Sequence, residues 1–427
     1  DTDMDSSDVM ALPYLLAQEG RQVLAVTVPA TGVAHCPAGA VHAAAIVQLM
    51  ERDVPVACGS GADEPNVHPF PDWLRALADN AYGLRLPAPQ RPPLGDAVAL
   101  LASTLSAAER PVTVLTLGPL TNLAQLIEQH PDLTPRIGRL VIMGGAFDVA
   151  GNVDANAAVG APEWNIWADP TAARTVVRSG IQLTMVPLDA TDDVPMTGAF
   201  VGQLERRHDR VAADLAYELM VRNPVLSSGG QFFWDQLTTV ALDYPEVLRA
   251  ERRRATVEAD GADAGRTRRD DSGTDIEVAI GADPDGFMTA FLGGLQRGPT
   301  SRSPFALRTS FEVGWDGSTC SAASASPAQT GAASVRFSDA TGAAGLFLVT
   351  LHDHSWRDLE TFAEHFAPGM AAPDFVGVTP IQARSPLPEV VDIDAAGTVG
   401  FACLTLNGSD VTGVTLSRSF DVAAGQR

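Results

Sequence analysis

Four aspartates fall within the first eight residues, a density of carboxylates that could support chemistry. They are Asp1, Asp3, Asp5 and Asp8, and an apolar run begins at Val9. Carboxylates this close repel one another unless a cation lies among them, so the first hypothesis is a hard divalent ion with oxygen ligands. The alternative is an acidic terminus that frays in solvent. The apolar run argues against it, because the run predicts a buried helix directly after the acids.

Two known motifs also begin with alternating aspartates, and each fits poorly. An EF-hand calcium loop requires glycine at its sixth position and glutamate at its twelfth, where this chain has Ser6 and Leu12. A phosphotransferase with an aspartyl nucleophile usually needs a lysine to hold the phosphoryl group, and the chain contains no lysine. The acidic stretch is better interpreted as a metal site of another kind.

The composition is that of a globular protein with more than one domain. The chain has 427 residues, of which 45% are apolar and 19% are charged. Its formal net charge of −23 disfavours nucleic acid or an anionic membrane as a partner, because both require positive protein surface. No apolar run reaches the roughly 18 residues of a transmembrane helix. These properties argue against both partners and against a membrane span.

The position of the D-x-D motif indicates whether the sequence lacks a strand, and the cysteines bear on the compartment in which the protein is located. A D-x-D motif in an α/β protein normally ends a strand, so we expect the first strand to be truncated in this sequence. The four cysteines show no C-x-x-C spacing, which argues against a zinc or redox motif. Cys320 and Cys403 lie on apolar, strand-like segments and could form a disulfide, although two buried thiols fit comparably well. A disulfide would favour a secreted or cell-envelope location over a cytoplasmic one.

The first part of the chain alternates short apolar strands with helical patterns. This alternation predicts βαβ units and a mostly parallel sheet, with ligands at the carboxyl ends of the strands. The predicted strands are Val23–Val28, Val54–Ala57, Val112–Leu117, Leu140–Met143 and Leu183–Leu188. The predicted helices between them lie near Ala38–Glu51, Asp96–Ala108, Leu120–His130 and Pro170–Ser179.

The remainder of the chain comprises the last part of this α/β domain and a second domain. Helices are predicted over Gly198–Met220, Leu237–Leu242 and Asp285–Leu295, with a strand pair formed by 255–258 and 276–280 and a loop over Gly261–Asp271. We place the α/β domain at residues 1–296 and a linker at 297–305, where glycine, proline and serine gather. Residues 306–427 show short alternating segments that predict an all-β, sandwich-like domain with one helix near Trp356–Phe366.

Polar segments with glycine or proline stand at the ends of several predicted strands. When each segment is considered alone, a turn or a helix cap explains its residues equally well. The segments are Leu117-Gly-Pro-Leu-Thr-Asn122, Met143-Gly-Gly145, Gly151-Asn152, Glu163-Trp-Asn165, Asp169-Pro170, Pro187-Leu-Asp189 and Phe233-Trp-Asp235.

Taken in this order and spacing, these segments and the opening motif resemble the inosine-uridine type nucleoside hydrolase family. The resemblance runs from Asp1 to about Leu295. It implies a Rossmann-like α/β core with a mostly parallel sheet flanked by helices. It also implies a nucleoside as the small-molecule partner and hydrolysis of the N-glycosidic bond to free base and ribose. Family members are commonly dimers or tetramers, so the resemblance further implies a homo-oligomer.

The resemblance assigns a calcium site to the acidic turn. The positions that match the family's calcium ligands are Asp3, Asp8, the backbone carbonyl of Leu117, and Asp235. The ion binds a water whose proton Asp3 is placed to accept, so Asp3 is the expected catalytic base. Ca²⁺ is therefore the expected cofactor.

Further positions match the family's substrate-binding residues, with two departures. Asn152, Glu163 and Asn165 match ribose-binding positions, although each also fits a loop or helix cap. In the family, an aspartate at the position of Ser7 binds the ribose hydroxyls. We therefore expect serine to weaken ribose binding, or to raise the activation free energy, by ~2 kcal/mol. Trp234 stands where purine-type members have a histidine that helps to protonate the leaving base.

Two functions of different classes follow. The first is a calcium-dependent nucleoside hydrolase that acts through Asp3. The second is a catalytically impaired calcium- and nucleoside-binding protein, with the C-terminal β domain as an interaction module. The ligand of that β domain is unknown from the sequence.

Overall fold

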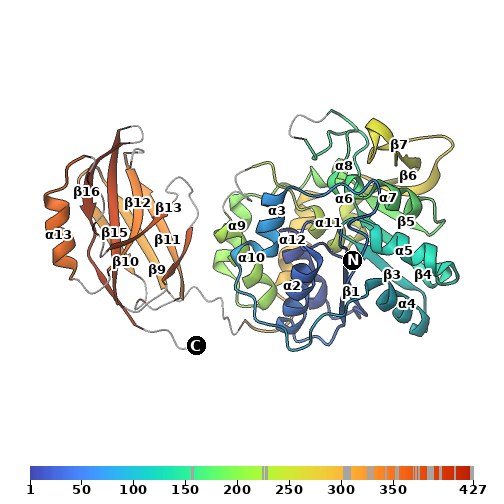
Figure 1. Cartoon of the computed structure of the whole chain (residues 1–427), viewed down its shortest axis with the longest axis horizontal. Coiled ribbons are helices and arrows are strands. Elements are labelled where there is room, and N and C mark those ends of the chain that lie inside the picture. The colour runs from blue at the N-terminus through green and yellow to red at the C-terminus, as the bar shows by residue number, and fades with distance from the viewer. Residues whose placement is uncertain are drawn as a thin grey trace. The chain divides into compact units, whose positions relative to one another are not determined.

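The computed structural model divides the chain into two compact units (Figure 1). One unit comprises Asp1–Leu219 with Leu226–Ser301, and the other comprises Met220–Val225 with Arg302–Arg427. The structure describes residues 1–154, 158–223, 226, 229–301, 309–324, 328, 331–341, 344–351, 355–368, 370, 373, 376–381, 389–393, 397–407 and 410–423. Residues 302–305 of the predicted linker lie outside this range.

The first unit is built on two sheets whose neighbouring strands are mostly parallel. The larger has the order β3-β4-β5-β8-β6-β7, in which β3, β4, β5 and β8 pair in parallel and β6 pairs antiparallel with β8 and β7. The smaller is a parallel pair of β1 and β2. The strands are β1 (Val26–Val28), β2 (Val56–Cys58), β3 (Val112–Thr116), β4 (Ile137–Met143), β5 (Leu183–Val186), β6 (Leu248–Val257), β7 (Thr267–Arg269) and β8 (Thr274–Ala282). The predicted mostly parallel α/β core is confirmed.

Twelve α-helices of the described residues surround these sheets. Two of them begin at aspartate caps, since the Asp96 side chain accepts a hydrogen bond from Ala99 N and the Asp169 side chain accepts one from Ala172 N. The helices are α1 (Asp8–Ala17), α2 (Cys36–Leu49), α3 (Asp72–Asp79), α4 (Ala97–Ala107), α5 (Thr121–Gln129), α6 (Trp164–Ala168), α7 (Pro170–Val177), α8 (Leu188–Thr191), α9 (Gly198–Arg206), α10 (Val211–Arg222), α11 (Trp234–Val240) and α12 (Pro284–Leu295).

The main core of this unit lies between the larger sheet and the helices α4, α5 and α7. Fully buried apolar side chains from β4 and β8, including Leu140, Ile142 and Val278, pack with Leu123 and Ala173 of the helices. The carboxyl end of β4, at Met143, packs with Ala11 of α1, the helix that begins at the end of the acidic turn, so this core helps to position the site.

Several predicted elements differ from the structure. The predicted strand over Val23–Val28 is a strand only from Val26 onward. The predicted helix Gly198–Met220 is two helices, because the polar stretch between them leaves the helical path and His208 bonds the buried Asp214 at 3.0 Å. The predicted loop Gly261–Asp271 contains β7, which pairs with β6.

The second unit contains two facing sheets with an apolar core between them. One sheet has the order β10-β9-β11-β14, and the other has the order β13-β12-β15-β16 with β17 beside β15. Phe311 of the first sheet packs edge-on against Phe401 of the second, with ring centroids 5.1 Å apart. The strands are β9 (Thr309–Trp315), β10 (Cys320–Ser324), β11 (Gly331–Asp339), β12 (Ala344–Leu351), β13 (Val376–Ile381), β14 (Glu389–Ile393), β15 (Gly397–Asn407), β16 (Asp410–Leu416) and β17 (Phe420–Val422).

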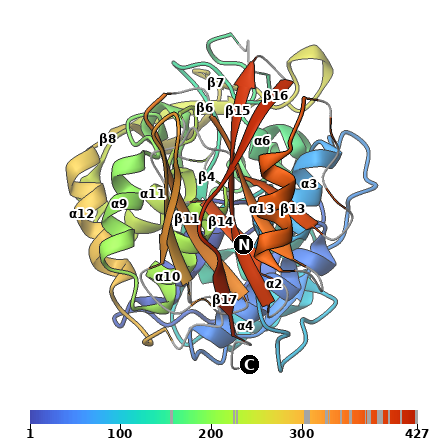
Figure 2. The ribbon, with the colours of Figure 1, turned by 90° about the vertical axis from the view of Figure 1, so that its left-hand side faces the viewer.

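The helix α13 (Trp356–Glu364) covers the outer face of the β12–β15–β16 sheet, as Figure 2 shows. Leu359 and Trp356 of α13 pack with Val349 and Ala402 of the strands. The helix begins at a capping box, in which Asp358 accepts hydrogen bonds from the backbone and hydroxyl of Ser355. The predicted C-terminal β-rich region with one helix is confirmed.

Both cysteine pairs form disulfides. Cys320 and Cys403 join β10 to β15, so the alternative of two buried thiols is wrong for this structure. The pair Cys36–Cys58, which joins the start of α2 to the end of β2, is absent from the sequence-based predictions. Across the part of the chain that the structure describes, no helix is both long and apolar enough to cross a membrane.

Candidate active site

The acidic turn begins between two strand ends of the first unit. Asp1 N donates to Leu115 O at 2.7 Å, Leu117 N donates to Asp1 O at 2.9 Å, and Thr2 N donates to Thr27 O at 2.9 Å. The chain therefore passes between the ends of β3 and β1 before it turns. The carboxylate of Asp1 accepts hydrogen bonds from the side chains of Thr27 and Asn122, which gives it a structural role.

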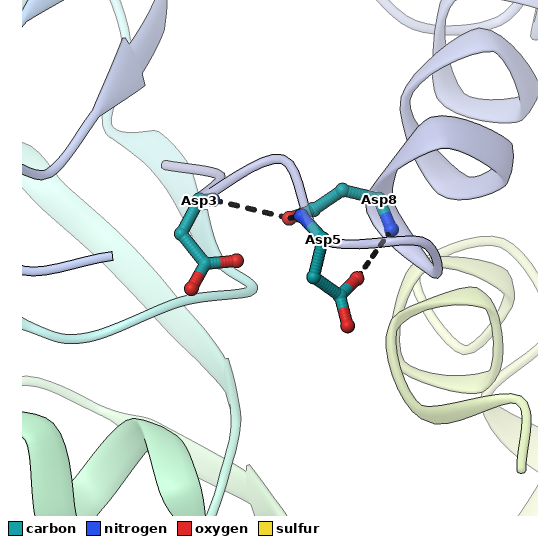
Figure 3. Close-up of side chains that lie close together, drawn as sticks. All are labelled: Asp3, Asp5 and Asp8. Atoms are coloured by element: carbon teal, nitrogen blue, oxygen red, sulfur yellow. Dashed lines mark hydrogen bonds between the residues drawn. The ribbon is translucent and has the colours of Figure 1, made fainter. Parts of the chain in front are cut away.

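The turn folds back on itself so that three aspartates face one another (Figure 3). Asp8 Oδ2 accepts hydrogen bonds from the backbone of Asp3 at 3.1 Å and of Asp5 at 3.2 Å, and Asp5 Oδ1 accepts one from Asp8 N at 3.0 Å. Between them Met4 has a φ of +57°, a conformation that costs a residue with a side chain of order 1 kcal/mol or more. The strained backbone is what places Asp3 and Asp5 on the same side.

Two glycines hold Asp3 in place by letting the backbone approach it. A Cβ on Gly32 would lie 2.3 Å from Asp3 Cβ, and a Cβ on Gly118 would lie 2.7 Å from the same atom. Gly118 belongs to the segment Leu117–Asn122, so this close approach is a physical reason for its glycine. Asp3 Oδ2 also accepts a hydrogen bond from Val33 N at 3.0 Å, which orients the carboxylate.

The carboxylates form a compact, buried oxygen cluster. Asp3, Asp5 and Asp8 each offer an oxygen, and these oxygens lie within 4.8 Å of one another. The Ser7 hydroxyl lies against both Asp5 Oδ1, at 2.8 Å, and Asp235 Oδ2. One hydroxyl hydrogen can satisfy only one of these carboxylates. Asp5 Oδ1 also accepts hydrogen bonds from the backbone N–H groups of Ser7 and Asp8, so Asp235 is the carboxylate that depends on this hydroxyl, a proton or a cation.

Burial and mutual repulsion raise the pKa values of this cluster. Burial, then the charges of Asp8 and Asp5, raises the pKa of Asp3 well above its usual range. Burial, then the charge of Asp5, raises the pKa of Asp8 to about 6. Burial, then the charge of Asp8, also raises the pKa of Asp235 well above its usual range. Without a cation the cluster therefore resists full ionisation.

The donor set fits a hard divalent cation. All of its donors are oxygens, and Asp8 Oδ1 and Asp235 Oδ1 are buried without a hydrogen-bond partner. Buried carboxylate oxygens without a partner are costly unless a metal binds them. Asp5, which the sequence comparison did not assign, belongs to this set. The Leu117 carbonyl already accepts a hydrogen bond from Asn165 Nδ2 at 3.0 Å, so it would use its second lone pair.

The three residues expected to contact ribose also form hydrogen bonds that hold the loops around the site. Glu163 caps α6, and its carboxylate accepts backbone hydrogen bonds from Asn165, Gly145 and Ile166. Its pKa is raised to about 7, because its burial outweighs these hydrogen bonds. Asn165 Nδ2 also contacts Met143 O at 3.3 Å, and Asn152 Oδ1 accepts a hydrogen bond from Trp164 N.

Two aromatic residues lie near the cluster. Trp234 begins α11 directly before Asp235, packs with Leu117, Met143 and Leu188, and has a buried indole nitrogen without a hydrogen-bond partner. Tyr82 was missed by the sequence reasoning. It is buried at a φ of +54°, and the charges of Asp5, Asp3 and Asp8 add to burial in raising its pKa. An aromatic residue directly before Gly83, in the short 3-10 turn after α3, was the available signal.

The fold and this cluster define an α/β protein with an oxygen-rich site, suited to a hard cation, at the carboxyl ends of its parallel strands. The family profile described as inosine-uridine preferring nucleoside hydrolase matches residues 1–289. The chain belongs to this family, whose members use a metal ion.

Curated relatives and solved structures agree with this family. Pyrimidine-specific ribonucleoside hydrolase RihA of Salmonella agona is 37% identical over 200 residues, which cover 45% of this chain and 60% of the relative. The Salmonella paratyphi C protein of the same name is 36% identical over 218 residues, which cover 49% and 64%. The chain thus spans less than two thirds of the length of these relatives.

Two solved structures share the fold. The inosine-uridine preferring nucleoside hydrolase of Bacillus anthracis has a TM-score of 0.63 at 24% identity, over 69% of this chain and 97% of that one. The purine-preferring ribonucleoside hydrolase of Gardnerella vaginalis has a TM-score of 0.59 at 24% identity, over 69% and 96%.

Proposed function

We propose that the protein hydrolyses the N-glycosidic bond of ribonucleosides to free base and ribose, with Ca²⁺ held by the acidic turn. The observation that carries this proposal is the buried oxygen cluster of Asp3, Asp5 and Asp8 in a chain of the nucleoside hydrolase family, with Asp235 joined to it through the Ser7 hydroxyl. The relatives' names include pyrimidine-specific and purine-preferring hydrolases, so the substrate class is a ribonucleoside of either base.

The chain's own residues would hold the ion and prepare the water. The carboxylates of Asp3, Asp5, Asp8 and Asp235 and the carbonyl of Leu117 would bind calcium. When bound, a divalent cation lowers the pKa of water and orients hydroxyl oxygens of a sugar. Asp3 then accepts the proton of the attacking water, since the Val33 N–H and the adjacent glycine backbones keep its carboxylate fixed.

The negative charge of the site would favour bond cleavage. As the glycosidic bond breaks, positive charge develops on the ribose ring. Carboxylate oxygens held in a buried site stabilise that charge without having to reorganise. Ser7, Asn152, Glu163 and Asn165 are the proposed ribose contacts, and Trp234 is the proposed contact of the base. Since an indole cannot act as an acid, departure of the base would depend on stacking or on another proton donor.

The test is product analysis on purified full-length protein with calcium. Uridine, cytidine, inosine and adenosine should be compared for release of free base and reducing sugar. Asp3→Asn should abolish release, whereas the matched control Asp132→Asn, at an exposed position far along the sequence, should leave the rate unchanged. No reducing sugar from any nucleoside, with calcium bound, would refute hydrolysis.

A second candidate function is binding of calcium and a nucleoside without turnover. The geometry of Ser7 favours it, because this side chain is fully buried and its hydroxyl is engaged with Asp5 and Asp235. Ser7→Asp distinguishes the two candidates, with Ser7→Asn as an uncharged control. A gain of about thirtyfold in kcat/KM in calcium is expected for the hydrolase, which corresponds to ~2 kcal/mol. Binding without turnover in both variants would support the second candidate.

A further inference from the structure

The loop that follows β4, residues 144–148, is held by side chains of other elements. Ala146 of this loop is fully buried, and its N–H donates to Thr267 Oγ1 at 2.9 Å. The Thr267 hydroxyl in turn donates to Ala146 O at 2.9 Å. One side chain therefore satisfies both backbone groups of a residue that water does not reach. Thr267 belongs to β7 and lies 121 positions later in the sequence.

Asp189 of α8 holds the next two residues of the same loop. Its Oδ2 accepts a hydrogen bond from Phe147 N at 2.9 Å, and its Oδ1 accepts one from Asp148 N at 2.8 Å. Glu163 holds the residue on the other side of Ala146, since its Oε2 accepts a hydrogen bond from Gly145 N at 3.0 Å. Four successive N–H groups of the loop are therefore each bound by a side chain from outside it.

The two glycines of this loop leave room for these side chains. A Cβ on Gly144 would lie 3.1 Å from Glu163 Oε2. A Cβ on Gly145 would lie 3.1 Å from both Oγ1 and Cγ2 of Thr267. The φ of Gly145 is +91°, which also disfavours any residue with a side chain. The loop backbone therefore lies against Glu163 at one glycine and against Thr267 at the next.

We infer that Thr267 is a positioning residue, whose hydroxyl fixes the loop so that the N–H of Gly145 fixes the carboxylate of Glu163. The inference rests on the proposed function, in which Glu163 contacts ribose. This carboxylate is held at both oxygens, because Oε1 also accepts a hydrogen bond from Asn165 N at 2.9 Å. A loop displaced by loss of the Thr267 hydroxyl would move it. A misplacement of about 1 Å in an active site can lower a rate by about 100-fold.

The hairpin of β6 and β7 makes further contacts that keep Thr267 in place. Arg266 Nε donates to Gly160 O at 2.9 Å. A Cβ on Gly265 would lie 2.7 Å from Trp167 Cα, so the hairpin backbone approaches α6 closely at this glycine. Thr267 is thereby held against the same stretch of chain that carries the proposed ribose contacts.

The experiment removes the hydroxyl with Thr267→Val, which keeps the shape of the side chain, and restores it with Thr267→Ser. Thr184→Val is the matched control, because Thr184 is also buried and its hydroxyl bonds Glu277 instead of this loop. Site-resolved amide exchange of the full chain in calcium should show Gly145 N–H exchanging at least about tenfold faster in Thr267→Val. The acceptor of this N–H, Glu163, is unchanged in the variant. Thr267→Ser and Thr184→Val should stay within about twofold of the parent protein.

Hydrolysis of the nucleoside that the parent protein cleaves best gives the second readout. Thr267→Val should lower kcat/KM at least about tenfold, and Thr267→Ser should recover most of that loss. In a Glu163→Ala background, Thr267→Val should lower kcat/KM by less than about twofold, because the carboxylate that Thr267 positions is gone. Thr184→Val should match the parent protein, and circular dichroism verifies that each variant is folded.

Equal exchange of Gly145 N–H in the parent protein and Thr267→Val would overturn the inference. A loss of kcat/KM that is as large in the Glu163→Ala background as in the parent would also overturn it, because Thr267 would then act independently of Glu163. Amide exchange does not depend on nucleoside hydrolysis. If the parent protein hydrolyses no nucleoside, the proposed function fails, and the exchange comparison alone decides whether Thr267 positions Glu163.

Discussion

At the scale of single residues, Asp5 is the unexpected member of the site. Its carboxylate lies with those of Asp3 and Asp8, and it receives the backbone N–H groups of Ser7 at 2.6 Å and Asp8 at 3.0 Å. We predict that Asp5→Asn weakens calcium binding at least tenfold, since ligand charge sets the affinity of oxygen sites. Calorimetric titration measures this. Unchanged affinity would assign Asp5 a role confined to holding the turn.

Glu163 should make stability depend on pH. Its pKa is raised from 4.5 to about 7 in the folded protein. Between these values the folded state holds a proton that the unfolded state has released, so stability falls as the pH rises. We predict that urea unfolding shows a smaller loss of stability from pH 5 to pH 8 in Glu163→Gln than in the parent protein. Parallel pH profiles of the two proteins would contradict this.

At the scale of elements, the turn after β3 holds Asp3 by close backbone contact. A Cβ on Gly118 would lie 2.7 Å from Asp3 Cβ and 2.9 Å from its Cγ. We predict that Gly118→Ala lowers the free energy of unfolding by about 1–3 kcal/mol and weakens calcium binding. The control is Gly20→Ala, where no heavy atom lies within 4 Å of the new Cβ. Equal effects of both substitutions in urea unfolding and calcium titration would refute the role of Gly118.

The elements themselves were largely predictable, because hydrophobic periodicity is a local property of the sequence. The strands β3, β4 and β5 and the helix α5 lie where the pattern indicated them. The break between α9 and α10 was not predictable, since it depends on the contact of His208 with Asp214.

The site was predictable to the extent that its residues follow motifs. Asp3, Asp8 and Asp235 were proposed as ligands from their positions. The structure brings Asp3 and Asp8 together with Asp5, and it places Asp235 against the Ser7 hydroxyl. Tyr82 and the disulfide Cys36–Cys58 were not found, because each depends on the tertiary approach of segments that are separate in the sequence. The capping contacts of Glu163 and Asn152 were raised as alternatives to ribose binding, and both are present.

At the scale of the whole molecule, the two disulfides lie in different units. Cys36–Cys58 closes a short loop in the first, and Cys320–Cys403 joins the two sheets of the second across 83 positions. We predict that Cys320→Ser with Cys403→Ser lowers the unfolding free energy of the second unit by about 2–4 kcal/mol. Urea unfolding measures it, and the corresponding Cys36 and Cys58 double variant is the control for the first unit.

Peptide mapping without reductant should recover both cystine pairs from the native protein. That result would support our proposal of a secreted or cell-envelope location, since disulfides persist in oxidising compartments. Four free thiols in protein from its natural compartment would contradict it.

The central claim is that the buried carboxylates hold one divalent cation on which nucleoside hydrolysis depends. The most direct test is to strip the protein with a chelator, titrate it with Ca²⁺, and follow bound calcium and the release of ribose in the same samples. We predict one calcium per chain at the acidic turn and a hydrolysis rate that rises in proportion to its occupancy. Full activity in the chelator, or full calcium binding with no ribose released from any nucleoside, would contradict the claim.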